Sequence, residues 1–568
     1  MNIFYKNLAK GELILPEHAR TRDFFIAILI SLFFLTIVTW ISYFGAPLTD
    51  ESFPIATALR FIQGQRPFID DFSPYIPIGL LLAPIVKLSL WIHHGKNELI
   101  LFLRHAYIIF TLGIAVYTFT LIKQSLPFLL AFFMSAAMII YHPFGINNFH
   151  YDTLSVLLWT SVLFQFFSFQ FFTPKTYQLI IFSICNALLC ATYPTFLFFL
   201  LPFYLLYSSR DKNANRMWIS HIIVGSIVLA LAAALIFLQY HVSIEDLSNT
   251  LAFSKRLFML SSEKGFFNKF RAISHSLKSI YTSYLLTAVS ILCMGYFFRK
   301  KPFLLSIAIY SVFLLPFVFI KTNYISYTEI FYILNCAGIA GLFLFLLFLR
   351  NDDTSKKLFF FIGLPALMAG LLTSSTSYNL ALNFNLGFFP ACILGYIFAF
   401  LAIEKYTSNL KKNYLFSRSL LILGSLIFGF CQIDYIYGTS VLGFNLYHEA
   451  KKFPLTGPFY GLYIENPFNQ LLVQLQKDVK YLDIDSSRFV YFGTVSSGYL
   501  LVDQLKPGDY LLFSPYHLAH FEEKIRLPAY VFDFSHILGL PEKDIQNYLS
   551  SDKLNLVQFN AQYSIYGS

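Results

Sequence analysis

The chain has 568 residues, of which 57% are hydrophobic and only 13% are charged. Soluble domains carry about 25% charged residues, so this composition excludes a soluble globular protein, and the solid apolar runs exclude disorder and coiled coil. A formal net charge of +10 would favour nucleic acid as a partner of a soluble protein, but here the distribution of the basic residues matters more than their sum. We therefore expect a membrane protein that does not bind nucleic acid.

Apolar runs long enough to cross a bilayer recur from residue 24 to residue 437. A spanning helix needs about 20 apolar residues, and about thirteen runs meet or approach that length. The first run is longer than a signal-peptide core and lacks a small-residue cleavage site, so we expect it to be a retained anchor. The predicted helices are 24–44, 99–121, 126–141, 153–172, 178–192, 195–207, 218–239, 280–298, 303–320, 329–349, 358–375, 386–403 and 419–437.

The basic residues predict which side of the membrane each loop occupies. With a cytoplasmic N-terminus, the loops expected inside carry most of the lysines and arginines, including a basic triplet at 299–301, as the positive-inside rule requires. We interpret 76–92 as an interfacial segment, because it contains two prolines and a lysine and because a further span would move that triplet outside. An odd number of spans then puts the C-terminus on the periplasmic or extracellular side of the cell inner (plasma) membrane.

The chain divides into a membrane domain, residues 1–437, and a tail, residues 438–568. Charged residues return in the tail and the apolar runs shorten. Residues 466–482 are typical of an amphipathic helix, and strands are predicted in RFVYFG, DYLLFSP, AYVFDF and NLVQFNAQYSIYG. The predicted fold class is mainly α, a polytopic integral membrane protein with a small extracytoplasmic α/β domain. That domain could cover the membrane site, shape an acceptor pocket or be a structural cap.

Two predicted outer loops are long, 45–98 and 241–278, and long loops between spans often hold the chemistry of membrane enzymes. The second is basic, which fits an anionic lipid substrate but equally fits lipid headgroups. In the first, Ser52 is a plausible N-cap of an amphipathic helix that Gly64 would stop. We expect this helix to lie along the membrane surface.

The first outer loop carries two acidic pairs. Asp50 and Glu51 follow the first predicted span, and Asp70 and Asp71 follow the surface helix. Carboxylates so near hydrocarbon are costly unless they bind cations or transfer protons. Taken alone, Asp50 and Glu51 could equally be the solvated end of a helix. The second pair favours a functional site, in which Asp70 and Asp71 would bind a cation or substrate.

This order of features resembles the first outer loop of GT-C glycosyltransferases: an acidic pair, an amphipathic helix, a Gly-Gln-x-Pro-Phe turn at 64–68, an aspartate and an aromatic-proline run. It is most similar to the bacterial relatives of protein O-mannosyltransferases and to the lipid A aminoarabinose transferase. The resemblance implies a membrane hexosyl- or pentosyltransferase that moves a sugar, with inversion, from a polyprenyl-phosphate donor to a lipid, glycan or protein acceptor on the outer face. Its partners would be that donor, membrane lipids and an acceptor that the sequence does not identify.

By this resemblance, Asp50 takes the position of the catalytic carboxylate and Glu51 that of its acidic neighbour. The chemistry is coherent, since a base must take the proton of the attacking acceptor hydroxyl. Asp152, at the start of the fourth predicted span, resembles a further aspartate of the family. His150 could join Asp152 in binding a divalent cation, Mg²⁺ or Mn²⁺, although a hydrogen-bonding interfacial histidine is the simpler interpretation.

A lipid phosphate that leaves with its negative charge needs cationic partners, and Arg60, Arg66 and Arg104 are available. Arg104 lies in an apolar stretch, so it should either pair with a carboxylate or phosphate or snorkel to the headgroups. The alternative function is a transporter or flippase of a lipid-linked saccharide. The enzyme is favoured over it because the acidic residues gather at one face and the chain shows no repeated halves.

Overall fold

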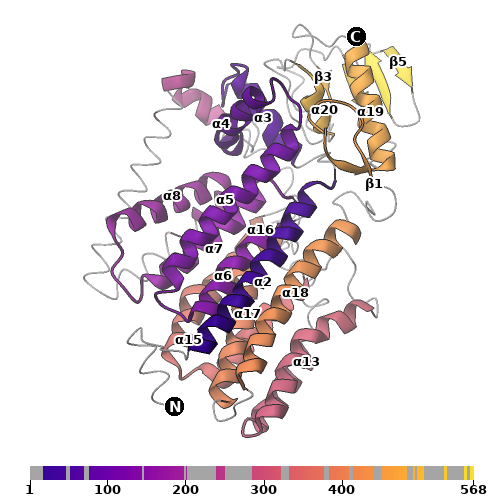
Figure 1. Cartoon of the computed structure of the whole chain (residues 1–568). Coiled ribbons are helices and arrows are strands. Elements are labelled where there is room, and N and C mark those ends of the chain that lie inside the picture. Colours follow the sequence, from indigo (N-terminus) through magenta and orange to yellow (C-terminus); the bar gives the residue numbers. More distant parts are fainter. Residues whose placement is uncertain are drawn as a thin grey trace.

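The structure is a computed structural model, and it forms a bundle of long helices with a group of short helices and strands at one end (Figure 1). Asp50, Asp70 and Asp71 lie outside the described residues, as do most of the predicted helices 195–207 and 218–239 and most of the second outer loop. The described residues are 17–45, 51–69, 76–143, 146–197, 200, 234, 238–249, 284–321, 332–376, 383–407, 413–438, 450–482, 490–492, 495–503, 530–533, 555–559 and 563–567.

The bundle is mainly helical, as the apolar runs predict. Two single π-helical turns, η3 (Phe345–Leu349) and η4 (Phe359–Gly363), interrupt it on either side of α15 (Asp353–Leu358). Further helices of the described bundle are α2 (Glu17–Ser42), α5 (Leu99–Ile122), α6 (Phe128–Ile140), α7 (Tyr151–Ser168), α8 (Thr176–Thr192), the helical residues Tyr284–Phe297, α13 (Pro302–Lys321), α14 (Tyr332–Leu344), α16 (Leu364–Thr376), α17 (Phe384–Thr407) and α18 (Asn413–Gly438).

Five helical stretches of the described chain are long and apolar enough to cross a membrane. The other predicted spans are shorter or less apolar helices there, or fall outside the described residues. Large apolar side chains on α2, such as Leu29 and Leu32, are exposed, which is typical of a surface that faces lipid. The five stretches are Thr21–Ser42, Leu99–Ile122, Asp353–Ser375, Phe384–Tyr406 and Phe416–Ile433.

Helix α17 is the centre of the bundle, because its apolar window is buried throughout and it packs against α7, α14, α16 and α18. Glycines bring its backbone against its neighbours. A Cβ added to Gly395 would lie 2.1 Å from the carbonyl oxygen of Ala337, and one added to Gly387 would lie 2.2 Å from the carbonyl carbon of Ala369. Small residues at such crossings allow the close helix packing on which membrane bundles depend.

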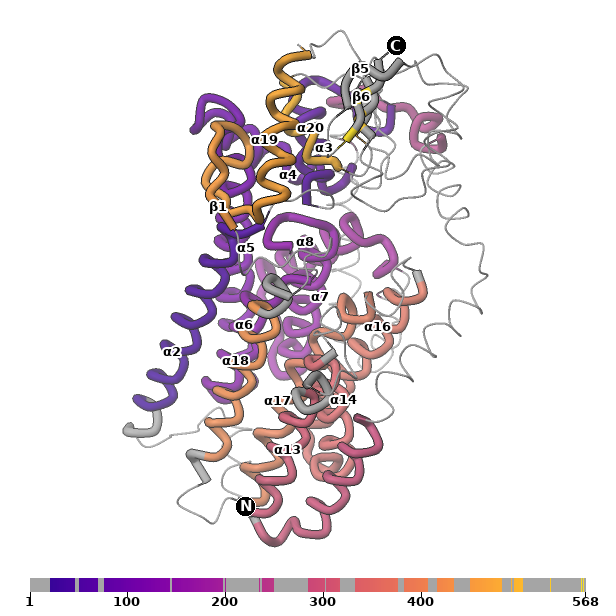
Figure 2. The backbone as a smooth tube through the Cα atoms, turned by 90° about the vertical axis from the view of Figure 1, so that its right-hand side faces the viewer, coloured from indigo at the N-terminus to yellow at the C-terminus, as the bar shows by residue number. Residues whose placement is uncertain are grey.

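The remaining elements gather at the end of the bundle where α2 finishes, as Figures 1 and 2 both show. Strand β1 (Ala450–Lys452) pairs antiparallel with β2 (Tyr463–Glu465), and a second sheet has the order β3-β4-β6-β5, with β3 parallel to β4. The other elements here are α3 (Ser52–Ile62), α4 (Ile76–Ile92), α19 (Asn466–Tyr481), α20 (Ser497–Leu501), β3 (Val490–Tyr491), β4 (Tyr530–Asp533), β5 (Asn555–Phe559) and β6 (Ser564–Gly567).

The helix predicted at 466–482 is confirmed as α19, and strands are present in three of the four predicted segments. The fourth segment, DYLLFSP, lies outside the described residues. Helix α4 has 17 residues and is shorter than the candidate spans, and the interfacial placement of 76–92 stays a prediction.

Two expectations about α3 are wrong. Ser52 is not its N-cap, because the helix already includes Ser52 and the cap position falls on Glu51, which makes no side-chain cap hydrogen bond. The helix also has no polar face turned to water, since every residue from Ser52 to Phe61 is buried. The reason is that α4 and α20 pack against it, and Gly79 of α4 approaches so closely that a Cβ there would lie 2.4 Å from Thr57. Gly64 does end the helix, with φ of +92°.

The glycine contacts of α17 yield a stability prediction. Gly395→Ala should destabilise the folded protein by about 1–3 kcal/mol, because the added methyl group must push two helix backbones apart. Gly113→Ala on α5 is the matched control: a Cβ there meets nothing within 4 Å, so stability should be unchanged or slightly higher. Thermal unfolding of the purified variants in detergent compares them. Equal melting temperatures would contradict the close packing of α14 and α17.

Candidate functional site

A buried ion pair joins the start of α3 to α5. Glu51, directly before α3, accepts a hydrogen bond from Nε of Arg104 at Oε1 (2.9 Å) and from Nη2 at Oε2 (2.8 Å). The side-chain amide of Asn148 donates a third hydrogen bond to Oε1 (2.9 Å). Both side chains of the pair are only 6% exposed. A bidentate guanidinium and carboxylate pair of this kind fixes orientation as well as charge.

Arg104 also binds the backbone at the C-terminal end of α2. Its Nη1 donates to the carbonyl oxygens of Ser42 (2.8 Å) and Phe44 (2.9 Å), and its Nη2 donates to that of Gly45 (3.3 Å). With the two bonds to Glu51, these contacts use all five donors of the guanidinium. Helix C-termini expose carbonyl oxygens that a cation stabilises. The structure therefore shows Arg104 paired with a carboxylate. Binding of a donor phosphate by Arg104 stays a prediction, and it would require the release of one of these contacts.

The loop before α7 reaches the same cluster through Asn148. The carbonyl oxygen of Asn148 accepts from Oγ1 of Thr153 (2.6 Å), which in turn accepts from the backbone N–H of His150 (3.0 Å). The backbone N–H of Asp152 donates to Nδ1 of His150 at 3.3 Å. His150 is therefore the N-cap of α7, and it holds Asp152 in the first turn, four residues after the contact with Glu51.

His150 is neutral in this setting, because complete burial lowers its pKa to about 3. Its Nδ1 lies 3.6 Å from Oδ2 of Asp152, so this approach is not an ion pair at neutral pH. The geometry matches the hydrogen-bonding interpretation of His150. Among the described residues, no group of three or more His, Cys, Asp and Glu side chains could hold a metal ion. A cation at His150 and Asp152 stays a prediction.

The other two candidate arginines have different surroundings. Arg60 is completely buried in α3, and its Nε donates to Oε1 of Gln65 at 2.6 Å. Arg66 is exposed. Hydrogen bonds from Ser243 lower the pKa of the Asp246 carboxyl group, and the positive charge of the nearby Arg66 lowers it further. These contacts do not test whether Arg60 and Arg66 bind a phosphate, so that role stays a prediction.

The tail is bound to the segment that follows α2. The N–H of Gly45 donates to the carbonyl oxygen of Tyr463 (3.0 Å), and the N–H of Tyr463 donates to that of Tyr43 (2.8 Å). The rings of Phe44 and Tyr463 stack with centroids 5.5 Å apart. Arg104 binds the carbonyl oxygens of Phe44 and Gly45, so the tail and the ion pair hold the same segment.

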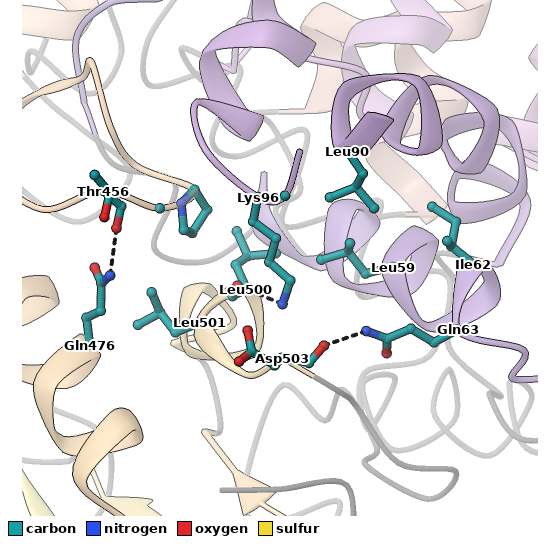
Figure 3. A pocket seen from close by; sticks show the side chains of 13 residues that line it. Leu59, Ile62, Gln63, Leu90, Lys96, Thr456, Gln476, Leu500, Leu501 and Asp503 are labelled. Carbon is teal, nitrogen blue, oxygen red and sulfur yellow. Dashed lines mark hydrogen bonds between the residues drawn. The ribbon is translucent and has the colours of Figure 1, made fainter. Parts of the chain in front are cut away.

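The tail also contacts the start of α5, and with α3 and α4 it lines a half-open cavity (Figure 3). The N–H of Glu98 donates to the carbonyl oxygen of Gly457 at 3.0 Å. The ammonium group of Lys96 donates to the carbonyl oxygens of Leu500 (3.3 Å) and Val502, at the end of α20. Burial lowers the pKa of Lys96 to about 8 against the opposing effect of Asp503.

Sequence reasoning missed Asn148, Tyr463 and Lys96. Only Asn148 left a signal, because two consecutive asparagines precede a predicted span and buried amides need partners. No protein-family model matches the chain, and no curated protein is significantly similar to it. The site is therefore argued from the geometry of this chain.

The ion pair yields a second stability prediction. Arg104→Met or Glu51→Leu should each destabilise the protein by about 3–5 kcal/mol, because each leaves a buried charge without its partner. The double variant should be destabilised by less than the sum of the two. Lys356→Met is the control, because Lys356 forms an exposed pair with Asp353, at 3.4 Å, and should matter little. Thermal unfolding measures these changes in stability. Small losses of stability in both single variants, or losses that add exactly in the double variant, would contradict a buried ion pair.

Proposed function

We propose that the chain is a GT-C type membrane glycosyltransferase that transfers a sugar from a polyprenyl-phosphate donor to an acceptor on the outer face of the plasma membrane. The observation that carries the proposal is the buried Glu51 carboxylate, which Arg104 and Asn148 fix directly before α3, in the segment that follows the first candidate span. A buried ion pair rarely makes a protein more stable than well-packed apolar residues would at the same place. The several hydrogen bonds that hold this pair therefore favour a role in ordering a site.

Glu51 is better suited to positioning than to proton transfer. Both of its oxygens accept short, charge-assisted hydrogen bonds, which leave little room for the proton of a substrate hydroxyl. Asp50 precedes Glu51 directly in the sequence, so a fixed Glu51 would hold that residue in register. We therefore assign the general base to Asp50 and its positioning to Glu51.

In the proposed reaction, the Asp50 carboxylate takes the proton of an acceptor hydroxyl as its oxygen attacks the anomeric carbon. The bond from that carbon to the phosphate oxygen breaks, and polyprenyl phosphate leaves with the electron pair. Arg60 and Arg66 would stabilise the departing charge. Asp70, Asp71 and Asp152 would bind a cation or the sugar, with Mg²⁺ or Mn²⁺ as the candidate ion.

The proposed topology has about thirteen spans, a cytoplasmic N-terminus and an extracytoplasmic α/β tail domain. The hydrogen bonds of Tyr463 with Tyr43 and Gly45 support it, because they join the segment at the start of the first outer loop to the tail. Both segments must then lie on one side of the membrane. With α2 leaving the cytoplasm, that side is the outer one.

A reporter fused after Ser568 tests this topology. An enzyme active only outside the cytoplasm should be active in the fusion, and one active only inside should not. Fusions of both reporters within the loop after Arg350, which is predicted to be cytoplasmic, supply the opposite control. A cytoplasmic signal from the C-terminal fusion would overturn the orientation and the site with it.

Substitution of Asp50 tests the chemistry. Asp50→Asn should lower transfer by roughly 10² or more, because general-base catalysis typically contributes 10² to 10⁴, while donor binding and thermal stability stay near those of the wild type. Glu51→Gln should lower stability together with activity, because it breaks a buried ion pair. Asp353→Asn, at an exposed carboxylate, is the matched control.

The assay measures release of polyprenyl phosphate by purified protein in nanodiscs. If Glu51→Gln abolished turnover in a stable protein while Asp50→Asn stayed active, the two roles would be exchanged. Full activity of both single variants and of the double variant would remove the central residue of the proposal and favour a transporter of lipid-linked saccharides.

A further inference from the structure

A basic turn joins two helices at the end of the bundle away from the tail. Residues 298–301, with the sequence Phe-Arg-Lys-Lys, connect the helix Tyr284–Phe297 to α13. The two helices pack as a hairpin, because a Cβ added to Gly295 would lie only 3.0 Å from the Cβ of Ala308. In Figures 1 and 2, α13 lies at the lower end of the bundle, opposite to α19.

Ring contacts identify this end of the bundle. Tyr296, just before the turn, packs against Phe348 of η3 with ring centroids 5.6 Å apart, and Phe348 packs against Tyr406 of α17 at 5.7 Å. Phe348 precedes Arg350 by two residues, and Tyr406 is the last residue but one of α17. The basic turn therefore lies at the end of the bundle where α17 finishes, which the proposed topology makes cytoplasmic.

Three consecutive cations of the turn form no ion pair with any described residue. Lys300 and Lys301 are exposed, and Arg299 is half-buried. The guanidinium of Arg299 lies over the ring of Tyr296, 4.1 Å from its centroid, and Nη1 donates to the carbonyl oxygen of Tyr296 at 3.4 Å. The remaining donors of Arg299 and both ammonium groups can bind an anion.

Other cations at the same end have polar partners. Arg418 pairs with Asp23 at 3.3 Å, and the ammonium group of Lys405 donates to the carbonyl oxygen of Phe348 at 2.8 Å. The stretches 1–16, 207–217 and 408–412, which are predicted to be cytoplasmic and lie outside the described residues, each contain more basic than acidic residues. Like charges repel one another at short range, so an anion beside the turn would stabilise it.

Exposed aromatic side chains flank the turn. Phe297 is 81% exposed and Phe303 is 63% exposed. Such an apolar surface is costly in water and suits lipid chains. A phenylalanine and a lysine two residues apart are both satisfied where hydrocarbon meets the headgroups. Exposed apolar side chains continue along both helices of the hairpin at Leu286, Met294, Ile307 and Leu314.

These features select one class of partner. An acidic protein could neutralise the three charges, but the exposed apolar surface extends from the turn along both helices, which a bilayer covers and a soluble partner does not. Hydrocarbon alone would cover Phe297 and Phe303 and leave the cations without solvation. An anionic phospholipid supplies both a phosphate and acyl chains.

We propose that the basic turn binds the phosphate groups of anionic phospholipids at the membrane surface. Arg299, Lys300 and Lys301 contact the headgroups, and Phe297 and Phe303 lie among the first carbons of the acyl chains. The proposal does not depend on sugar transfer. The proposed topology enters only in assigning the turn to the cytoplasmic leaflet.

Native mass spectrometry of the full-length protein in mild detergent tests the proposal. The probes are phosphatidylglycerol and phosphatidylcholine with the same acyl chains, and phosphatidylglycerol should bind more tightly. Lys300→Gln and Lys301→Gln should each weaken its binding by about 5-fold, and both together with Arg299→Gln by roughly 100-fold, because each basic residue near an anionic surface contributes about that factor. Lys300→Arg, which keeps the charge, should bind like the wild type.

A second triple variant controls for net charge. Arg350→Gln, Lys356→Gln and Lys357→Gln together remove the same charge at the same end of the bundle but leave the turn intact, so tight binding of phosphatidylglycerol should remain. Phe303→Ala should weaken the binding of both lipids, because it removes apolar contact with the chains. Thermal unfolding of each variant separates lost binding from lost structure.

Four outcomes would overturn the proposal. Phosphatidylcholine could bind as tightly as phosphatidylglycerol, or the triple variant of the turn could keep the wild-type affinity, which would point to a partner other than lipid. An equal loss in the control triple variant would show that net charge, and not the turn, attracts the lipid. Displacement of phosphatidylglycerol by an equal concentration of glycerol 1-phosphate would indicate a site for a soluble phosphate.

Discussion

The ion pair of Glu51 and Arg104 is the contact on which the arrangement of α2, α3 and α5 depends. One guanidinium neutralises a buried carboxylate and also binds the carbonyl oxygens of Ser42, at the end of the first candidate span, and of Phe44, just after it. A charge at this depth is tolerated only when its hydrogen bonds are complete, and here every donor of Arg104 is used. The pair therefore fixes where α2 ends, where α3 begins and how both lie against α5.

The tail extends this arrangement by backbone hydrogen bonds. Tyr463 binds the segment after α2, and Gly457 binds the residue before α5. The tail therefore contacts the segment that Arg104 binds and also the beginning of the helix that carries Arg104. Backbone hydrogen bonds do not depend on the identity of the side chains. The side chains of the tail and of the first loop can therefore line a cavity between them. The membrane part is held differently, by glycines that bring α17 against its neighbours. A polar network orders one end, and close helix packing holds the remainder.

Much of the helical architecture could be predicted, because lipid requires long apolar runs and these are visible in sequence. The amphipathic period likewise located α19. The burial of α3 could not be predicted, since its cover comes partly from α20, more than four hundred residues later. Arg104 was recognised as a cation in need of a partner, but the choice of Glu51 depends on how α2 and α5 pack. Asn148 joins the cluster from a loop, and Tyr463 of strand β2 binds the segment after α2. One sequence does not show which of these distant segments meet.

The most direct test of the account is a cryo-electron microscopy structure of the full-length protein with a polyprenyl-phosphate sugar analogue. The account predicts the sugar and phosphate at the first outer loop, with the anomeric carbon beside Asp50 and the polyprenyl chain directed into the lipid. The Glu51 and Arg104 pair should remain intact in that complex. An analogue bound midway across the bundle, away from the first outer loop, would contradict the account and indicate a transporter.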